Sequence, residues 1–491
     1  MSELTSCNNA TLRVYQPTTD NPWDAKKVQH LCRRLGFGAT HSTIESALLQ
    51  TPSDFVDALI DEAINMPQTP APMWGLYEDY SVFLEVYGNS TAVSQAVNPL
   101  RKEMECTFCE DMRTNNLRDR LTLFWSNHFV TEFNTYNAPN YLFQQYQMWQ
   151  TQAIGNFKDF VREVGLNKAM LFYLNGFENK ASSPNENYAR ELYELFTMGV
   201  DNGYTQDDIV ETARALTGYN QKVSHWGEIA FNPTHFDAGN KTIFGQTGNW
   251  DYDDVIDILF AQKETLIATY ICKKFYAYFV SPELNMTIVD ELAQTFISND
   301  FEIAPVLRLL FKSEHFFDAY SIGTIVKSPM DLFISFQKEL EMEYVDRNLN
   351  ETTRTVLYYL NVTLFIPPNV AGWSEDNSWL TSATLPERWL RMKHLLIYQN
   401  NENNNVLKNF AINLFDVNED ADAIAKGIVD YFLSKPLVHD PEYDEAIAIF
   451  KSGVPENYFT DGTWSLNYSL VPTQVFNLLK HIIIIPEFQL K

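Results

Sequence analysis

One short stretch concentrates side chains that could do acid–base chemistry: residues 182–199, with the sequence SSPNENYARELYELFTMG. Asn185 is a suitable helix N-cap, and Glu186 would occupy the first helical position, where a carboxylate interacts favourably with the helix dipole. Polar and apolar residues then recur at helical spacing on opposite faces. The apolar face consists of Ala189, Leu192, Tyr193 and Phe196, and the polar face of Asn187, Arg190, Glu191 and Glu194. We therefore predict an amphipathic helix with one charged side.

The charged side of this helix has two interpretations. It could be a solvated face, on which Arg190 and Glu194 form an ordinary i,i+4 ion pair. Alternatively, Glu191 and Glu194 point inward together, as carboxylates do in helical metal sites, and their repulsion raises the pKa of one of them. The carboxyl groups would then act as general acid and base or hold a divalent metal, and Arg190 would bind an anionic group of the substrate.

Two further stretches carry histidine. FWSNHF places Asn127 and His128 among aromatic residues, so His128 is either a hydrogen-bonded core residue or a shielded member of the site. THFDAGNK places His235 and Asp237 on one face of an extended segment, as a metal- or substrate-binding pair would be. A turn-forming aspartate before Gly239 is the alternative. The sequence has no nucleophile elbow, P-loop, dinucleotide fingerprint or H-E-x-x-H motif, so these residues carry the candidate chemistry.

Composition excludes several classes of protein. The chain has 491 residues, of which 45% are hydrophobic and 14% aromatic, enough for a large core. Its net charge of −27 disfavours binding to nucleic acid or to an anionic membrane. No apolar run approaches the roughly 18 residues that a membrane span needs. The five cysteines show no disulfide spacing, and we expect Cys106 and Cys109, a C-x-x-C in a helical context, to be ordinary thiols.

The pattern along the chain predicts a mainly α fold. Helical periodicity dominates, and residues 97–128 read as one long or broken helix that ends at the histidine motif. Residues 228–246 interrupt this pattern with a β-hairpin or a long ordered loop. We expect an N-terminal extension (1–24), a large helical body (25–400) and a C-terminal helical appendage (401–491), separated by the polar segment 400–406.

The candidate residues belong to a set of motifs that occur in one order. These are HLCRRLGFGAT (30–40), LTLFWSNHF (121–129), AIGNFKDFV (153–161), PNENYARELYELFTMGV (184–200), YTQDDIVETARALTGY (204–219), HFDAGNKTIFGQTG (235–248), VKSPMDL (326–332) and PPNVAGW (367–373). Together they resemble the bacterial family catalogued as domain of unknown function 1800 (DUF1800), over roughly residues 25–400. Ser126 departs from the family pattern, because relatives often carry another histidine there, and this weakens a two-histidine metal site.

The resemblance implies no accepted activity. It implies a sulfatase- or phosphatase-like partner, since members are often encoded beside such proteins, and members are often exported. The N-terminal sequence MSELTSCNNATLRVYQ has neither the basic region nor the apolar core of an export signal, which favours the cytoplasm. Because the motifs recur as one unit, the resemblance also favours a buried polar cluster at the 184–200 motif over a solvated face.

Two hypotheses follow. In the first, the protein is a hydrolase-type enzyme acting on a glycan or ester, with a polar pocket inside the helical body. Its candidate catalytic residues are Glu191, Glu194, His128 and Arg190, and its candidate substrate-binding residues are Asn127, Asn187, His235, Asp237 and Trp373. In the second, the polar cluster is a structural network and the protein binds or scaffolds a partner, with the aromatic-rich loop 361–381 as the contact.

Overall fold

The structure of the chain, a computed structural model, describes residues 11–491. The predicted N-terminal extension falls partly outside these residues, as do Cys7 and most of the segment judged for an export signal. None of the described helices is long and apolar enough to cross a membrane.

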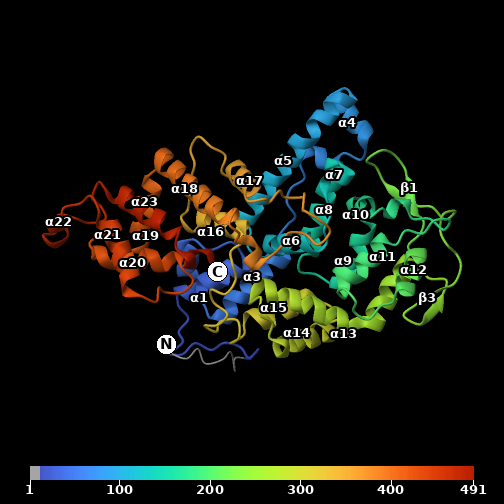
Figure 1. Cartoon of the computed structure of the whole chain (residues 1–491), viewed down its shortest axis with the longest axis horizontal. Helices are drawn as coiled ribbons and strands as arrows, with labels where there is room; N and C mark the ends of the chain where they lie inside the picture. The colour runs from blue at the N-terminus through green and yellow to red at the C-terminus, as the bar shows by residue number, and fades with distance from the viewer. Residues whose placement is uncertain (1–10) are drawn as a thin grey trace.

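Helices dominate the described part of the chain, which confirms the mainly α prediction (Figure 1). The first half contains α1 (Ala25–Leu35), α2 (His41–Leu48), α3 (Pro52–Asn65), α4 (Tyr80–Tyr87), α5 (Ser90–Thr114), α6 (Leu117–His128), α7 (Phe133–Tyr136), α8 (Pro139–Gln152), α9 (Phe157–Leu166), α10 (Lys168–Tyr173), α11 (Asn187–Glu191) and α12 (Gln206–Ala215). The second half contains α13 (Tyr252–Phe279), α14 (Met286–Ser298), α15 (Ile303–Phe311), α16 (Pro329–Glu339), α17 (Leu349–Tyr359), α18 (Thr384–Glu402), α19 (Asn405–Leu414), α20 (Ala421–Phe432), α21 (Asp440–Lys451), α22 (Glu456–Thr460) and α23 (Val471–Ile482).

Short helical turns lie between these helices. Four are 3-10 turns: η1 (Met73–Leu76), η2 (Gly176–Glu178), η4 (Asp376–Trp379) and η5 (Pro486–Gln489). The fifth, η3 (Leu192–Thr197), is a π-helix that directly continues α11. The helix predicted from the 182–199 stretch is therefore a short α-helix followed by a wider π turn. Its N-cap position is Glu186 rather than Asn185, whose side chain instead accepts a hydrogen bond from the backbone N–H of Asn187.

The insert around 228–246 forms two hairpins rather than one. Strand β2 (Ile229–Phe231) pairs with β1 (Tyr219–Lys222), which lies before the predicted insert. Strand β3 (Lys241–Ile243) pairs with β4 (Gln246–Gly248). The alternation at the two ends of the insert thus belongs to separate two-stranded antiparallel sheets, and its Pro/Asp/Gly-rich centre connects them.

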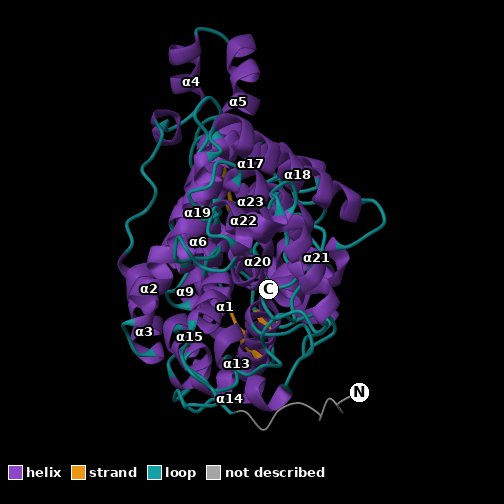
Figure 2. Cartoon of the chain, turned by 90° about the vertical axis from the view of Figure 1, so that its left-hand side faces the viewer, coloured by secondary structure: helices purple, strands orange, loops and turns teal. Residues whose placement is uncertain are grey.

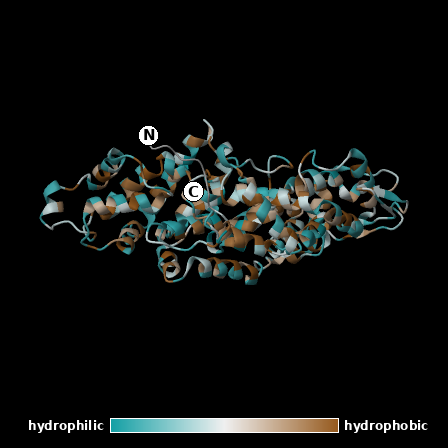
Figure 3. Cartoon of the chain, turned by 90° about the horizontal axis from the view of Figure 1, so that it is seen from below, coloured by the Kyte–Doolittle hydropathy of each residue, from teal (hydrophilic) through white to brown (hydrophobic). Residues whose placement is uncertain are grey.

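The molecule is elongated, with α19–α23 at one end and the hairpins with α12 at the other (Figure 1). Helix α4 and the start of α5 project from the body (Figure 2). Hydrophilic and hydrophobic residues are interspersed along most helices, as expected for amphipathic helices around a shared core (Figure 3). Aromatic rings fill much of that core: Trp125 of α6 stacks on Phe129 and Phe157 and meets Phe275 of α13 edge-on.

The C-terminal helices are attached to the body through specific contacts. Gln29 of α1 donates to the carbonyl of Tyr431 at 3.0 Å, and Lys26 donates to that of Leu433 at 2.9 Å. Residues 400–406 are mostly helical, because α18 continues to Glu402 and α19 begins at Asn405. The boundary between body and appendage near residue 400 stays a prediction.

Candidate functional site

Helix α6 and the loop before η4 interlock through one asparagine. Asn127 Oδ1 accepts a hydrogen bond from the backbone N–H of Trp373 at 2.8 Å, and its Nδ2 donates to the Trp373 carbonyl at 3.2 Å. The same Nδ2 lies 3.4 Å from Glu375 Oε1. Gly372 makes this approach possible: its φ is +80°, and a Cβ there would lie 2.2 Å from Asn127 Oδ1. Two sequence motifs more than 200 residues apart therefore form one unit.

This unit covers a pair of adjoining cavities. One has a volume of about 230 Å³ and lies between α6, α13 and the loop; its lining residues include His128, Lys274 and Glu375. The other, of about 160 Å³, lies toward the start of α16 and includes Asp331, Trp379 and Lys491 in its lining. Both are lined by Asn127, Ala277, Trp373 and Glu375. The walls combine aromatic and apolar surface with a few polar groups, which is typical of a small-molecule site.

An amine and a carboxyl group face this space. Burial lowers the pKa of Lys274 to about 8, against the attraction of Glu375. Loss of hydration raises the pKa of Glu375, against the attraction of Lys274, although Glu375 lies exposed on the rim of the cavity. Because each group affects the pKa of the other, the two lie within electrostatic reach. Both shifts move the titration of these groups toward neutral pH, the range that acid–base catalysis needs.

His128 lies in the same wall as a neutral side chain. Burial, together with the charge of Lys274, lowers its pKa well below the ordinary value. Its Nε2 donates to the carbonyl of Phe196 at 2.9 Å, which leaves Nδ1 as an acceptor. Nδ1 is buried and has no hydrogen-bond donor among the described residues. His128 thus joins the cavity wall to the end of the π-helix η3.

A buried ion-pair network forms the far wall. Asp331 lies 2.6 Å from both Arg120 and Lys491, and all three side chains are at most 5% exposed. Asp331 also caps α16 by accepting from the Ser328 N–H and hydroxyl at 3.1 and 2.8 Å. Although burial opposes it, the charges of Arg120 and Lys491 hold the pKa of Asp331 well below its usual range. Asp331 is therefore a fixed carboxylate with an architectural role.

The polar face of α11 and η3 makes its contacts elsewhere. Arg190 pairs with Glu186 at 3.0 Å and with Glu194 at 3.4 Å, and it also donates to Gln206 of α12 at 3.0 Å. Arg190 is 37% exposed and Glu194 is 22% exposed, while Asn187 lies at the surface. Burial and the charge of Glu194 raise the pKa of Glu191. The hydrogen bonds and ion pairs of this face, as far as the structure describes it, do not involve His128 or Asp237.

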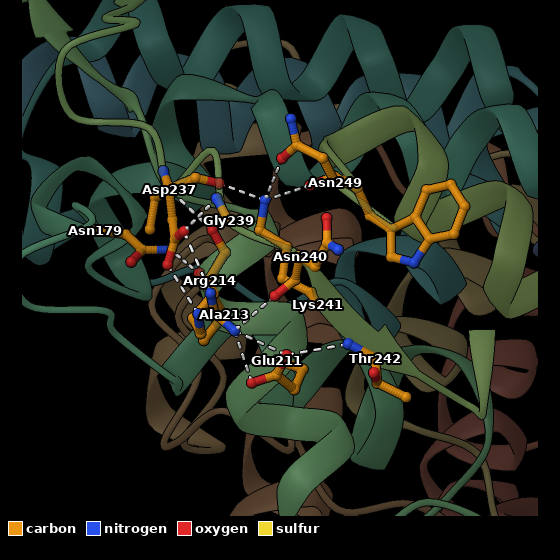
Figure 4. A network of polar contacts seen from close by, with 12 residues as sticks. Asn179, Glu211, Ala213, Arg214, Asp237, Gly239, Asn240, Lys241, Thr242 and Asn249 are labelled. Atoms are coloured by element: carbon orange, nitrogen blue, oxygen red, sulfur yellow. Dashed lines mark hydrogen bonds and ion pairs between the residues drawn. The ribbon is translucent and has the colours of Figure 1, made fainter. Parts of the chain in front are cut away.

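His235 and Asp237 also separate. Asp237 pairs with Arg214 of α12 at 2.8 Å and accepts from the Gly239 N–H at 2.8 Å, so the turn-forming alternative describes its geometry (Figure 4). His235 is exposed, and its Nδ1 lies 2.8 Å from Asn220 Oδ1. Lys241 lies beside Asp237 and donates to Asn249 Oδ1 at 3.0 Å (Figure 4). The group holds the hairpins on α12.

The structure thus brings together three of the predicted site residues, Asn127, His128 and Trp373, and places the others in two different regions. Sequence reasoning missed Lys274, Glu375 and Asp331. The motif VKSPMDL includes Asp331, and the motif PPNVAGW ends two residues before Glu375. These motifs therefore pointed to the segments that carry both carboxyl groups. Lys274, in YICKKFY, had no such signal, because its helix reads as ordinary core.

Within residues 11–491, no group of three or more His, Cys, Asp or Glu side chains is arranged to hold a metal ion. Cys106 and Cys109 are free thiols in α5. Burial raises the pKa of both thiols.

One family model matches most of the chain. The model of DUF1800, described as a protein of unknown function, matches residues 30–490, which includes the C-terminal helices. Comparisons with curated proteins and with solved structures found no similar protein. The match covers most of the chain and every motif named above, and the chain therefore belongs to the DUF1800 family.

Proposed function

We propose that the joined cavities are the active site of a hydrolase-type enzyme that acts on a small ester or amide. The observation that carries this proposal is that Lys274 and Glu375 both line a cavity built by the histidine and PPNVAGW motifs, and that each influences the pKa of the other. Asp331 is fixed by two ion pairs, with Arg120 and Lys491. Lys274 and Glu375 have no comparable ion pair in the described residues.

The available groups favour acyl hydrolysis over glycoside hydrolysis. Glycosidases use a pair of carboxyl groups on either side of the scissile bond. Here the second carboxylate, Asp331, is held by Arg120 and Lys491. Asp376 accepts from the Val326 N–H at 2.9 Å. One free carboxylate and a nearby ammonium suit the attack of water on a carbonyl group instead, because the first can accept the proton of the water and the second can stabilise the oxyanion.

Each residue has a distinct part in this proposal. Glu375 removes a proton from the attacking water, and the Lys274 ammonium stabilises the negative charge that develops on the carbonyl oxygen. The protonated Glu375 then gives this proton to the leaving alcohol or amine as its bond to the carbonyl carbon breaks. Trp373, Trp379 and Tyr278 supply apolar wall for the rest of the substrate. Asn127 and His128 are positioning residues: the first holds the loop that carries Glu375, and the second ties the wall to η3.

The test is hydrolysis of 4-nitrophenyl acetate, butyrate and hexanoate by the full chain. We expect Glu375→Gln to lower kcat/KM by about 10²- to 10⁴-fold, with kcat/KM of the wild type rising above the raised pKa of Glu375 and falling near that of Lys274, about 8. Glu191→Gln, which changes a carboxyl in the other polar region, is the matched control and should stay within about twofold. Hydrolysis no faster than without protein, or unchanged in Glu375→Gln, would reject the proposal.

The second candidate function is binding or scaffolding, with the sulfatase- or phosphatase-like partner that the family resemblance implies. The observation in its favour is that Ser374, Asn377 and Ser378 of the 361–381 loop are exposed, while its Trp373 is buried. A pull-down with such a partner that is abolished by Asn377→Arg, in a chain without ester hydrolysis, would select this function.

A further inference from the structure

Lys274 lacks the kind of fixed partner that holds two other enclosed lysines, Lys491 and Lys241. Lys491, which lines the adjoining cavity, is held by Asp331 at 2.6 Å. Lys241 donates to Asn249 Oδ1 at 3.0 Å and to the Trp250 carbonyl at 2.9 Å. The Lys274 side chain is half-buried, and the structure of residues 11–491 gives it neither a hydrogen bond nor an ion pair. Its Nζ lies 5.1 Å from the centre of the Tyr270 ring.

These surroundings suit a nucleophilic amine. A lysine that is partly removed from water, and not fixed by a carboxylate, gives up its proton more easily and keeps a lone pair for attack on a carbonyl carbon. The cavity of about 230 Å³ supplies room for a small ligand beside it, and Glu375 on its rim can transfer protons. The aromatic wall, which includes Phe124 and Trp373, can hold the ligand's apolar part.

We propose that Lys274 forms an imine with small aldehydes or ketones that enter this cavity. This inference goes beyond hydrolysis and requires only the cavity and its amine. The lone pair of the neutral amine attacks the carbonyl carbon, the N–C bond forms, and a proton moves from nitrogen to oxygen to give the carbinolamine. The protonated Glu375 then gives its proton to the hydroxyl, the C–O bond breaks, and water leaves. Glu375 takes back a proton from nitrogen, so that amine and carbonyl compound have become imine and water.

The experiment uses the full chain with benzaldehyde as the probe and cyanoborohydride to reduce any imine to a stable benzylamine. Peptide mass mapping then locates the benzyl group and follows its accumulation. We expect Lys274 to be labelled at least about tenfold faster than Lys273, because its lowered pKa raises its fraction of free amine and because it lines the cavity that holds the probe. Lys273 is the matched control: it is the neighbouring residue on α13 and lines neither cavity.

Two variants sharpen the test. Lys274→Met should remove this label and leave the labelling of other lysines unchanged, and Glu375→Gln should slow it several-fold by removing the acid that expels water. Labelling of Lys274 no faster than that of Lys273, or equally fast in urea-unfolded chain, would overturn the proposal. Ester hydrolysis is measured on the same samples: hydrolysis that depends on Glu375, without a Lys274 adduct, would overturn the imine and keep the hydrolase. An adduct without hydrolysis would support the imine and reject the hydrolase.

Discussion

Two polar regions of this protein differ in how their charges are engaged. On the face formed by α11 and η3, Arg190 satisfies Glu186 and Glu194 at the surface, with side chains 22–38% exposed. At the cavity covered by the 361–381 loop, Lys274 and Glu375 influence each other's pKa without a close ion pair in the structure. The region with the more conspicuous sequence pattern is thus the one in which an arginine already pairs with two carboxylates.

Regular spacing of charged residues favours pairing within one helix. Side chains at i and i+4 meet on the surface of one helix and neutralise each other there. Groups that come from distant segments meet only through tertiary packing, and burial can then leave them unpaired and shift their pKa values. If the cavity and the helix face differ in this way, substitutions around the cavity should change the free energy of unfolding more than substitutions on the helix face.

The largest effect is expected from Asp331→Asn. The change leaves Arg120 and Lys491 buried without their common carboxylate, so the free energy of unfolding should fall by about 3–5 kcal/mol. Urea unfolding of the full chain, followed by circular dichroism, measures it. Glu194→Gln makes the same kind of change on the helix face and should cost less than about 1 kcal/mol. Equal losses in the two variants would remove the distinction between the regions.

Gly372→Ala should cause the second-largest loss of unfolding free energy. The added methyl group meets Asn127 Oδ1 at 2.2 Å, in a backbone conformation with φ of +80°. We expect a loss of about 2–4 kcal/mol in unfolding free energy from overpacking and backbone strain together. Gly245→Ala is the control, because φ is +77° there while a Cβ would meet nothing within 4 Å. It should cost only the backbone strain, about 1 kcal/mol. A Gly372 variant no less stable than the Gly245 variant would contradict the interlock of the two motifs.

Lys274→Met should stabilise the chain at pH 7, by about 1–2 kcal/mol. Burial lowers the pKa of Lys274 to about 8 in the folded chain, whereas an unfolded lysine titrates near 10.4. Between these values the unfolded chain binds more protons, so the wild type gains stability as the pH rises. The advantage of the variant should therefore shrink from about pH 8 upward. Lys273→Met provides the reference, and a Lys274 variant less stable than it at pH 7 would show that Lys274 is held by favourable contacts.

The smallest effect is expected from Glu191→Gln combined with Glu194→Gln. The raised pKa of Glu191 means that its charged form is slightly unfavourable in the folded chain, and this gain offsets the lost pair between Glu194 and Arg190. The net change should lie within about 1 kcal/mol at pH 7. The gain from Glu191 should shrink as the pH falls through its folded pKa, where the wild-type carboxyl becomes protonated, and should vanish below the pKa of an unfolded glutamate. A loss above about 2 kcal/mol would identify the helix face as a buried network and reverse the comparison.

Much of the fold could be predicted from local signals. Thr51, followed by a proline, is the N-cap of α3, and Thr205 and Asp208 form the capping box of α12. The loss of helix around 228–246 was also visible in the pattern, whereas the pattern of 97–128 left one long helix and the broken pair α5 and α6 as alternatives. The pairing of β2 with β1 was not visible in the pattern, because β1 begins only a few residues after α12 and its own residues carry no strand pattern.

The candidate site was predictable only in part. Their chemistry and motif context predicted Asn127, His128 and Trp373 as site residues, and the structure places all three in the lining of one cavity. Lys274 could not be selected, because a lysine on a long helix is ordinary until a neighbouring element shields it from water. The sequence by itself determined the helical class, the acidic charge and the family. Tertiary structure alone decided which charges pair and which stay open, since pairing depends on distances between segments that the local pattern does not contain.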